Sequence, residues 1–365
     1  MNRILAFIIF LSFCFVGSAF AVEPPRKTHN VVIVTLDGFR YQELFGGADE
    51  SLLNSNFGGV READRVRKGY WRETPEARRA VLLPFFWNTI AKEGQILGDR
   101  NRDCVMKLTN GLKFSYPGYS EMFCGKSDPL IVSNNKINNP NLSVLEFLNT
   151  RPALEGRVAA FCTWDVFPFI FRSSENRLKV HAGWTPIVDG ELTKLQRESN
   201  ERMELLPKYW PNNVFDIVTM EAATLHLQRH RPRVIYIGLG ETDEWAHAKR
   251  YDLYLDAARN ADRFLAQLWK SLQSMDEYRD KTLLLVTTDH GRGATRHDWT
   301  NHGAKIEDAE FIWLAALGPD VPPRGVREKV DATQSQLAAT IAHALGENFQ
   351  SAVPNAAPPL PIFGD

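Results

Sequence analysis

The sequence lacks an excess of charge of either sign. It contains 43 Lys and Arg residues against 44 Asp and Glu residues, which leaves a formal net charge of -1. A protein that binds nucleic acid through its phosphates needs a basic surplus, so we expect no nucleic-acid-binding surface. Hydrophobic residues make up 44% of the chain, which excludes a disordered protein and allows a large core.

Long apolar runs are absent beyond the N-terminus. The run at residues 4–16 follows Arg3 and precedes the small-x-small sequence Ala19-Phe20-Ala21. This is the pattern of a secretory signal peptide, and the run is short for a membrane span. We therefore expect residues 1–21 to be removed and residues 22–365 to form one exported domain, periplasmic or secreted, without a membrane span. Oligomeric state cannot be read from the sequence.

Cysteine is scarce. Of the four cysteines, Cys14 lies in the expected signal peptide, which leaves Cys104, Cys124 and Cys162. Export permits disulfides, but three cysteines form at most one internal pair. Cys104 and Cys124 bracket a Gly- and Asn-rich loop and are the better candidates for that pair. Three buried thiols are the alternative, and the spacing fits no zinc-finger pattern.

Short β-branched runs alternate with patterns of helical period along most of the chain. Buried strands that alternate with helices predict an α/β fold, with a mainly parallel β-sheet sandwiched between α-helices. The expected strands lie at residues 31–36, 158–161, 234–239, 283–288 and 311–317. The expected helices lie at residues 85–93, 143–148, 214–228, 252–272 and 334–345.

Two segments interrupt this alternation, near residues 46–79 and 164–208. The first is charged and poor in strand signals, which favours a solvated insertion over a lid on a binding site. The second begins with an aromatic stretch in which Phe167, Phe169 and Phe171 recur at a spacing of two. That spacing favours core packing over a platform for a ligand.

Acidic and histidine residues gather where the expected strands end. Ligands of open α/β sheets bind beyond the carboxyl ends of the strands. One such Asp is usually a turn residue, and one such His usually has a structural role, but their convergence on one sheet edge indicates a site. The residues are Asp37, Asp243, His247, Asp289, His290 and His302.

The spacing of these residues suits metal ions. Asp243 and His247 are four residues apart, so a helix places them on one face. Asp289 and His290 leave a strand together and point in opposite directions. Carboxylate and imidazole ligands suit Zn²⁺, with Mn²⁺ or Fe as alternatives. Two ligand sets predict a two-metal site, which is typical of in-line displacement at phosphorus.

A nucleophile would lie on a nearby loop. Ser115 stands among turn-forming residues, just before a helical stretch at residues 119–123. The N-terminus of a helix favours an anion, because its backbone N–H groups have no partner within the helix. From the residues alone, however, Ser115 is better interpreted as the N-cap of that helix.

Taken together, these motifs resemble those of the alkaline phosphatase superfamily. The resemblance runs from about residue 31 to residue 346 and implies an alkaline phosphatase-like catalytic domain. The motifs stand in the family's order: Thr35-Leu36-Asp37-Gly38, Ser115-Tyr116-Pro117, Asp243-x-x-x-His247, Asp289-His290-Gly291 and His302-Gly303.

The resemblance also implies roles for these residues. It implies one metal ion held by Asp243, His247 and His302, and a second held by Asp37, Asp289, His290 and Ser115. It replaces the N-cap interpretation of Ser115 with that of a nucleophile that forms a covalent phosphoserine. The expected activity is hydrolysis of a small phosphate ester by a phosphatase or phosphodiesterase. The alternatives are a phosphoryl or phospho-head-group transferase, a sulfatase, or a non-catalytic relative.

Departures from the family's patterns bear on the substrate. Tyr119 occupies the position of the arginine in the sulfatase maturation pattern, which argues against a sulfatase. Phosphodiesterase members carry an asparagine about twenty residues after the nucleophile, and Asn135 is the candidate for that substrate contact here. An ordinary Asn-rich turn is the alternative. Arg40, Lys136 and Arg292 are candidate cations for a monoester dianion, or else ordinary surface charges.

Overall fold

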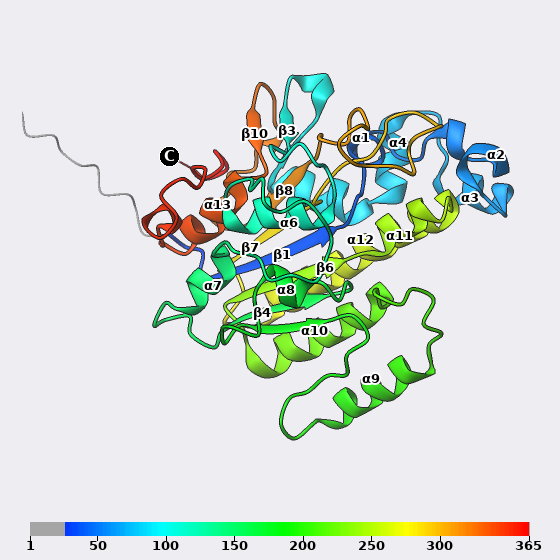
Figure 1. The fold of residues 1–365 in the computed structure, drawn as a ribbon. Coiled ribbons are helices and arrows are strands. Elements are labelled where there is room, and N and C mark those ends of the chain that lie inside the picture. Colours follow the sequence, from blue (N-terminus) through cyan, green and yellow to red (C-terminus); the bar gives the residue numbers. More distant parts are fainter. Residues whose placement is uncertain (1–25, 365) are drawn as a thin grey trace, which may run out of the picture.

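The computed structural model describes residues 26–364 (Figure 1). The expected signal peptide at residues 1–21 lies outside this range, as does Cys14. No helix in the described range is both long and apolar enough to cross a membrane.

The centre of the molecule is an eight-stranded sheet with the strand order β5-β4-β6-β1-β7-β8-β2-β9. Neighbouring strands pair in parallel except where β8 meets β7 and β2, so β8 runs against the other strands. A separate parallel pair joins β3 to β10. The strands are β1 (Asn30–Leu36), β2 (Gln95–Leu97), β3 (Val105–Lys107), β4 (Val158–Cys162), β5 (Lys179–Ala182), β6 (Val234–Leu239), β7 (Thr282–Thr287), β8 (Leu314–Leu317), β9 (Gly325–Val326) and β10 (Asp331–Thr333).

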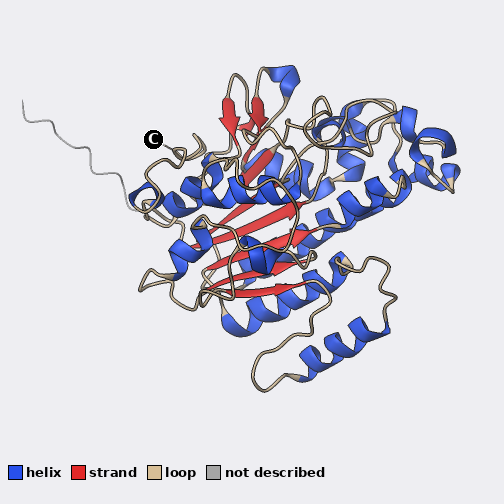
Figure 2. Ribbon diagram, in the orientation of Figure 1, coloured by secondary structure: helices blue, strands red, loops and turns tan. Residues whose placement is uncertain are grey.

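Helices cover both faces of this sheet (Figure 2). Alternate residues of β1 enter two different apolar clusters: Val31 and Ile33 pack on one face, Val32 and Val34 on the other. The period of two in a buried strand therefore builds a three-layer molecule. The helices are α1 (Tyr41–Gly46), α2 (Ser55–Gly58), α3 (Ala63–Tyr70), α4 (Pro75–Leu82), α5 (Ala91–Glu93), α6 (Ser115–Cys124), α7 (Val144–Asn149), α8 (Phe167–Ile170), α9 (Lys194–Leu205), α10 (Asp216–His230), α11 (Glu241–His247), α12 (Tyr251–Ser274) and α13 (Gln336–Ala344).

The predicted α/β class is confirmed, and most expected elements lie close to their predicted positions. The helix expected at residues 85–93 is instead a π-helical turn, Phe86–Ile90, followed by the short α5. The strand expected at residues 311–317 begins only at Leu314 and is antiparallel to β7. A long loop, rather than a crossover helix, joins β7 to β8, and such a loop permits the antiparallel direction.

The two interrupting segments are more integrated than expected. Residues 46–79 contain short helices, and Leu52 and Val66 are buried in the same apolar cluster as α12. The expectation of a merely solvated insertion is therefore wrong for these parts. In the second segment, β5 extends the central sheet. Phe167 and Phe171 are core residues, as the core interpretation predicts.

The three described cysteines are free and buried. Cys104, Cys124 and Cys162 all belong to one apolar cluster. The pairing of Cys104 with Cys124 is therefore wrong, and the alternative of three buried thiols is the one observed.

Candidate active site

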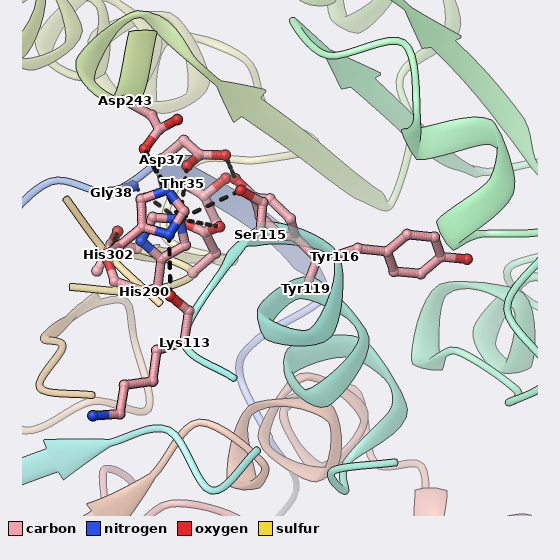
Figure 3. A network of polar contacts seen from close by, with 12 residues as sticks. Thr35, Asp37, Gly38, Lys113, Ser115, Tyr116, Tyr119, Asp243, His290 and His302 are labelled. Atoms are coloured by element: carbon pink, nitrogen blue, oxygen red, sulfur yellow. Dashed lines mark hydrogen bonds and ion pairs between the residues drawn. The ribbon is translucent and has the colours of Figure 1, made fainter. Parts of the chain in front are cut away.

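Three adjacent strands bring the predicted site residues to one edge of the sheet. The strand order places β1 between β6 and β7, with all three parallel. Asp37 follows β1, α11 follows β6, and Asp289 follows β7. The side chains of Asp37, Asp243 and His290 converge beside Ser115 at the start of α6 (Figure 3). The strand-end argument from sequence therefore located this cluster.

The first ligand group consists of Asp243, His247 and His302, whose potential ligand atoms lie within 4.8 Å of one another. The Nε2 atom of His247 lies 3.2 Å from Asp243 Oδ2. The Nε2 atom of His302 lies 3.7 Å from Asp243 Oδ1 and 3.0 Å from His247 Nε2. Asp243 and His247 share one face of α11, as their spacing predicts.

The second ligand group consists of Asp37, Asp289 and His290, all buried. The Nε2 atom of His290 lies 3.4 Å from Asp37 Oδ1 and 3.5 Å from Asp289 Oδ2. Gly38 lets the two groups approach closely, because a Cβ atom there would lie 2.8 Å from Asp243 Oδ1. The positive φ of 58° at Gly38 also favours glycine.

Backbone contacts orient the histidines. The Nδ1 atom of His290 lies 2.9 Å from the carbonyl oxygen of Gly291, and that of His302 lies 3.2 Å from the carbonyl oxygen of Lys113. A proton on Nδ1 donates to each carbonyl and leaves the Nε2 lone pair available to a metal ion. Both Nε2 atoms face the acidic groups described above.

The second group has the chemistry of a cation site. Asp37 Oδ1 and Asp289 Oδ2 are buried and have no hydrogen-bond partner within the described residues. Burial raises the pKa of Asp289 to about 8, and the negative charge of Asp243 adds to this effect. Burial also raises the pKa of Asp37 well above its usual value, with further contributions from Asp289 and Asp243. A bound cation would offset this repulsion, so the donors fit a metal ion.

His290 and His302 are in the protonation state that metal binding requires. Burial lowers the pKa of His302 to about 4 and holds that of His290 well below its ordinary value. Both rings are therefore neutral at pH 7, and a neutral imidazole is the form that binds a metal ion.

Ser115 lies beside the second group. It is the first residue of α6, and its Oγ atom is 3.3 Å from His290 Nε2. The N-cap of α6 is Phe114, whose side chain makes no capping hydrogen bond. The N-cap interpretation of Ser115 is therefore wrong. Pro117 lies in the first helical turn, where its missing N–H needs no partner.

The three candidate cations have carboxylate partners. Arg40 is fully buried and contacts Glu43, which makes it a structural residue. Arg292 is also buried, and its Nη2 atom lies 2.9 Å from Asp243 Oδ1. Lys136 is partly exposed and lies 2.7 Å from Asp165 Oδ2. Lys136 is therefore the candidate with the most solvent access.

Two contacts near Ser115 were not foreseen. Tyr119 donates a hydrogen bond to Asp37 Oδ2 at 2.9 Å. Asn134, rather than Asn135, contacts the nucleophile segment, because its Oδ1 atom accepts a 3.0 Å hydrogen bond from the Tyr116 backbone N–H. Asn135 is exposed, and its backbone N–H donates to Ser133. The i, i+4 spacing of Ser115 and Tyr119 is the sequence feature that could have predicted the contact between Tyr119 and Asp37.

The comparisons with known proteins agree with this architecture. Residues 188–348 match the family model described as the Metalloenzyme superfamily. A comparison with curated protein sequences gives no match. The solved structure of the alkaline phosphatase PafA aligns with a TM-score of 0.60 and 11% identity, over 94% of this chain and 100% of that chain.

Two further structures carry different activities in their names. The phosphonate monoester hydrolase SpPMH from Silicibacter pomeroyi aligns with a TM-score of 0.55 and 13% identity, over 91% of this chain and 76% of that chain. The 2-O GAG sulfatase BT1596 aligns with a TM-score of 0.52 and 12% identity, over 88% of this chain and 71% of that chain. The chain thus has the alkaline phosphatase-like fold that its motifs predict, and residues 188–348 match the metalloenzyme superfamily.

Proposed function

We propose that the protein is an exported two-metal hydrolase of phosphoric esters that acts through a covalent phosphoserine on Ser115. The position of Ser115 carries this proposal. Its hydroxyl lies 3.3 Å from His290 Nε2, beside two groups of potential metal ligands. A buried serine in the first turn of a helix, next to paired ligand groups, is suited to attack on phosphorus.

The residues that would hold the metal ions are those of the two ligand groups. Asp243, His247 and His302 would hold one ion, and Asp37, Asp289, His290 and Ser115 the other. Zn²⁺ suits these donors best, with Mn²⁺ or Fe as alternatives. Such ions, when bound, lower the pKa of the serine hydroxyl and stabilise negative charge on the leaving oxygen.

The reaction has two steps at phosphorus. Ser115 Oγ forms a bond to phosphorus and loses its proton, while the ester P–O bond breaks and the alcohol oxygen takes up a proton. Water then hydrolyses the phosphoserine, which releases phosphate and restores the serine hydroxyl. A transferase would use a second alcohol in place of water, and product analysis separates the two.

The position of Tyr119 favours phosphate over sulfate esters. Its ring is buried, and its hydroxyl contacts Asp37, so this position does not supply the arginine of the sulfatase pattern. The likeness to PafA and SpPMH supports phosphorus chemistry, whereas that to BT1596 keeps sulfate esters in the test. We expect phosphomonoesters and phosphodiesters both to be accepted to some extent.

A panel of four nitrophenyl esters tests the proposal. The kcat/KM of purified protein is measured for p-nitrophenyl phosphate, bis-p-nitrophenyl phosphate, a p-nitrophenyl phosphonate and p-nitrophenyl sulfate. We expect turnover of the phosphorus esters and poor turnover of the sulfate. A preference for the sulfate would overturn the phosphoric ester assignment, and inactivity on all four by the metal-loaded protein would contradict the proposed reaction.

The substrate contact is tested with neighbouring variants. Because Asn134 is the residue that touches the nucleophile segment, Asn134→Ala is expected to lower kcat/KM for the diester, by roughly tenfold for one lost hydrogen bond. Asn135→Ala serves as the matched control and is expected to behave like wild type. A loss in Asn135→Ala alone would instead support Asn135, the residue predicted from sequence, as the substrate contact.

A further inference from the structure

Tyr119 is a buried tyrosine whose hydroxyl ends at a predicted metal ligand. Only 1% of Tyr119 is exposed, and its ring packs edge-to-face with that of Phe167, with centroids 4.7 Å apart. Its hydroxyl donates to Asp37 Oδ2 at 2.9 Å (Figure 3). The ring packing fixes where this hydroxyl lies, so the contact is built into the core.

The two oxygens of the Asp37 carboxylate have different environments. Oδ2 receives the Tyr119 hydrogen bond, whereas Oδ1 is buried, has no hydrogen-bond partner among the described residues, and lies 3.4 Å from His290 Nε2. The Asp37 backbone is also fixed, because its carbonyl accepts a 2.6 Å hydrogen bond from the Thr242 hydroxyl. Rotation of the carboxylate away from the second group would break the Tyr119 bond.

The same helix face carries the candidate nucleophile. Ser115 and Tyr119 are four residues apart in α6, so both side chains point to the end of the sheet. One reaches His290 and the other reaches Asp37, and these are two members of the same ligand group. A shift of α6 along its axis would disturb both contacts together.

We propose that Tyr119 is a positioning residue for the second metal ion. Its hydroxyl holds Asp37 with Oδ1 directed at the ion, and its place on α6 couples the ligand to Ser115. Outer hydrogen bonds of this kind commonly change metal affinity by roughly 10- to 100-fold. The inference rests on the proposed two-metal function.

The test compares Tyr119→Phe with Tyr116→Phe. Both variants remove one buried hydroxyl from α6, but the Tyr116 hydroxyl donates to the carbonyl oxygen of Ile137 at 2.6 Å rather than to a ligand residue. Zinc affinity is measured by competition with a chromophoric chelator and by calorimetry, starting from metal-free protein. The melting temperature of each metal-free variant is measured beside it.

We expect Tyr119→Phe to weaken one of two zinc sites by roughly 10- to 100-fold and to leave the other unchanged. Activity should return to within a few-fold of wild type at saturating zinc, because only the affinity is impaired. Tyr116→Phe should bind both ions like wild type, even where its melting temperature falls as much.

Two results would overturn the inference: wild-type affinity at both sites in Tyr119→Phe, or equal weakening in the two variants. A purely structural role for Tyr119 would lower the metal-free melting temperature without a selective loss at one site. Wild-type protein that binds no zinc would instead contradict the proposed function, so the two failures are distinguishable.

Discussion

Ser115 differs from a helix-capping serine in what its hydroxyl contacts. A cap accepts a hydrogen bond from a backbone N–H two or three residues later, as Ser143 does from Glu146 at the start of α7. The Ser115 hydroxyl instead lies beside His290, and Ser115 is buried with 6% of its surface exposed. Removal of the Ser115 hydroxyl therefore tests its role in catalysis without removing a helix cap.

Replacing the hydroxyl isolates that role. Ser115→Ala is expected to lower kcat by roughly three or more orders of magnitude, because the attacking atom is lost. The fold should persist, since the side chain supports no capping bond. Steady-state kinetics check the activity, and a thermal melt of the purified variant checks the fold. Ser115→Thr should retain part of the activity, and ordinary turnover by a folded Ser115→Ala protein would rule out Ser115 as the nucleophile.

At the scale of elements, the site depends on how closely α6 approaches the end of β7. Gly118 lies in the first turn of α6, and a Cβ atom there would lie 2.6 Å from the carbonyl oxygen of Asp289. That oxygen belongs to the backbone, so α6 or the segment after β7 must shift to admit a methyl group. The absence of a side chain at residue 118 therefore sets the separation of Ser115 from the second ligand group.

Gly118→Ala is expected to lower both activity and stability. Overpacking of this kind costs about 1–3 kcal/mol of unfolding free energy, and a displaced nucleophile lowers kcat. Urea unfolding and kinetics measure the two effects. Gly69→Ala is the control, because Gly69 lies inside α3 with nothing near its Cβ position. The control should be neutral or slightly stabilising; equal behaviour of both variants would contradict the close-packing argument.

The two ligand groups use different combinations of elements, which makes them separable. Asp37 and Asp289 follow β1 and β7, whereas Asp243 and His247 belong to α11. Asp37→Ala should lower the metal occupancy of the second site, and Asp243→Ala or His302→Ala should lower that of the first. Elemental analysis of purified protein should find about two equivalents of metal in wild type, and a chelator should abolish turnover reversibly. Full activity with one metal equivalent, or none, would contradict a two-metal site.

At the scale of the whole molecule, the sequence predicted the parts of the fold that local patterns encode. The runs around Val31, Val234 and Leu283 became adjacent parallel strands, and the acidic residues after them met at one edge. Buried strands need apolar residues on both faces, so they leave a strong signal. The strand-end rule then predicted that these acidic and histidine residues would meet at one edge, without knowledge of the strand order, whereas their division into two groups came from the family resemblance.

The remaining features depend on tertiary packing, which leaves little trace in the local sequence. The edge strand β5 reads Lys-Val-His-Ala, which is too short and polar to stand out. The antiparallel direction of β8 is permitted by its loop connection, and nothing in its own short apolar run indicates it. Which of Asn134 and Asn135 contacts the nucleophile segment depends on one residue of register in a loop. The Tyr119 contact joins a helix to a distant strand end.

Away from the site, two buried histidines on neighbouring elements link stability to pH. His181 on β5 and His226 on α10 both pack against Phe161, with ring centroids 5.5 and 5.0 Å away. Burial lowers the pKa of His181 to about 4 and that of His226 to about 3, and the neighbouring His230 adds to the shift of His226. Both ring nitrogens of His181 are also without a hydrogen-bond partner in the described range. The folded protein therefore keeps both rings neutral.

The unfolded chain binds these protons first, because an unperturbed histidine has a pKa of about 6.5. The neutral rings therefore cost no stability above pH ~6.5. Below that pH the free energy of unfolding falls, until the pH reaches about 4 for His181 and about 3 for His226. Below pH ~6.5 the slope approaches about 1.4 kcal/mol per pH unit for each ring, which amounts to about 2 kcal/mol per ring between pH 7 and pH 5. Urea unfolding at pH 7 and pH 5 should show a smaller loss in His181→Met and in His226→Met than in wild type, by about that amount each. The comparison cancels the titration of shared groups that do not contact the replaced ring, including the candidate ligand residues. An identical pH dependence in wild type and both variants would mean that neither ring is held neutral in the folded protein.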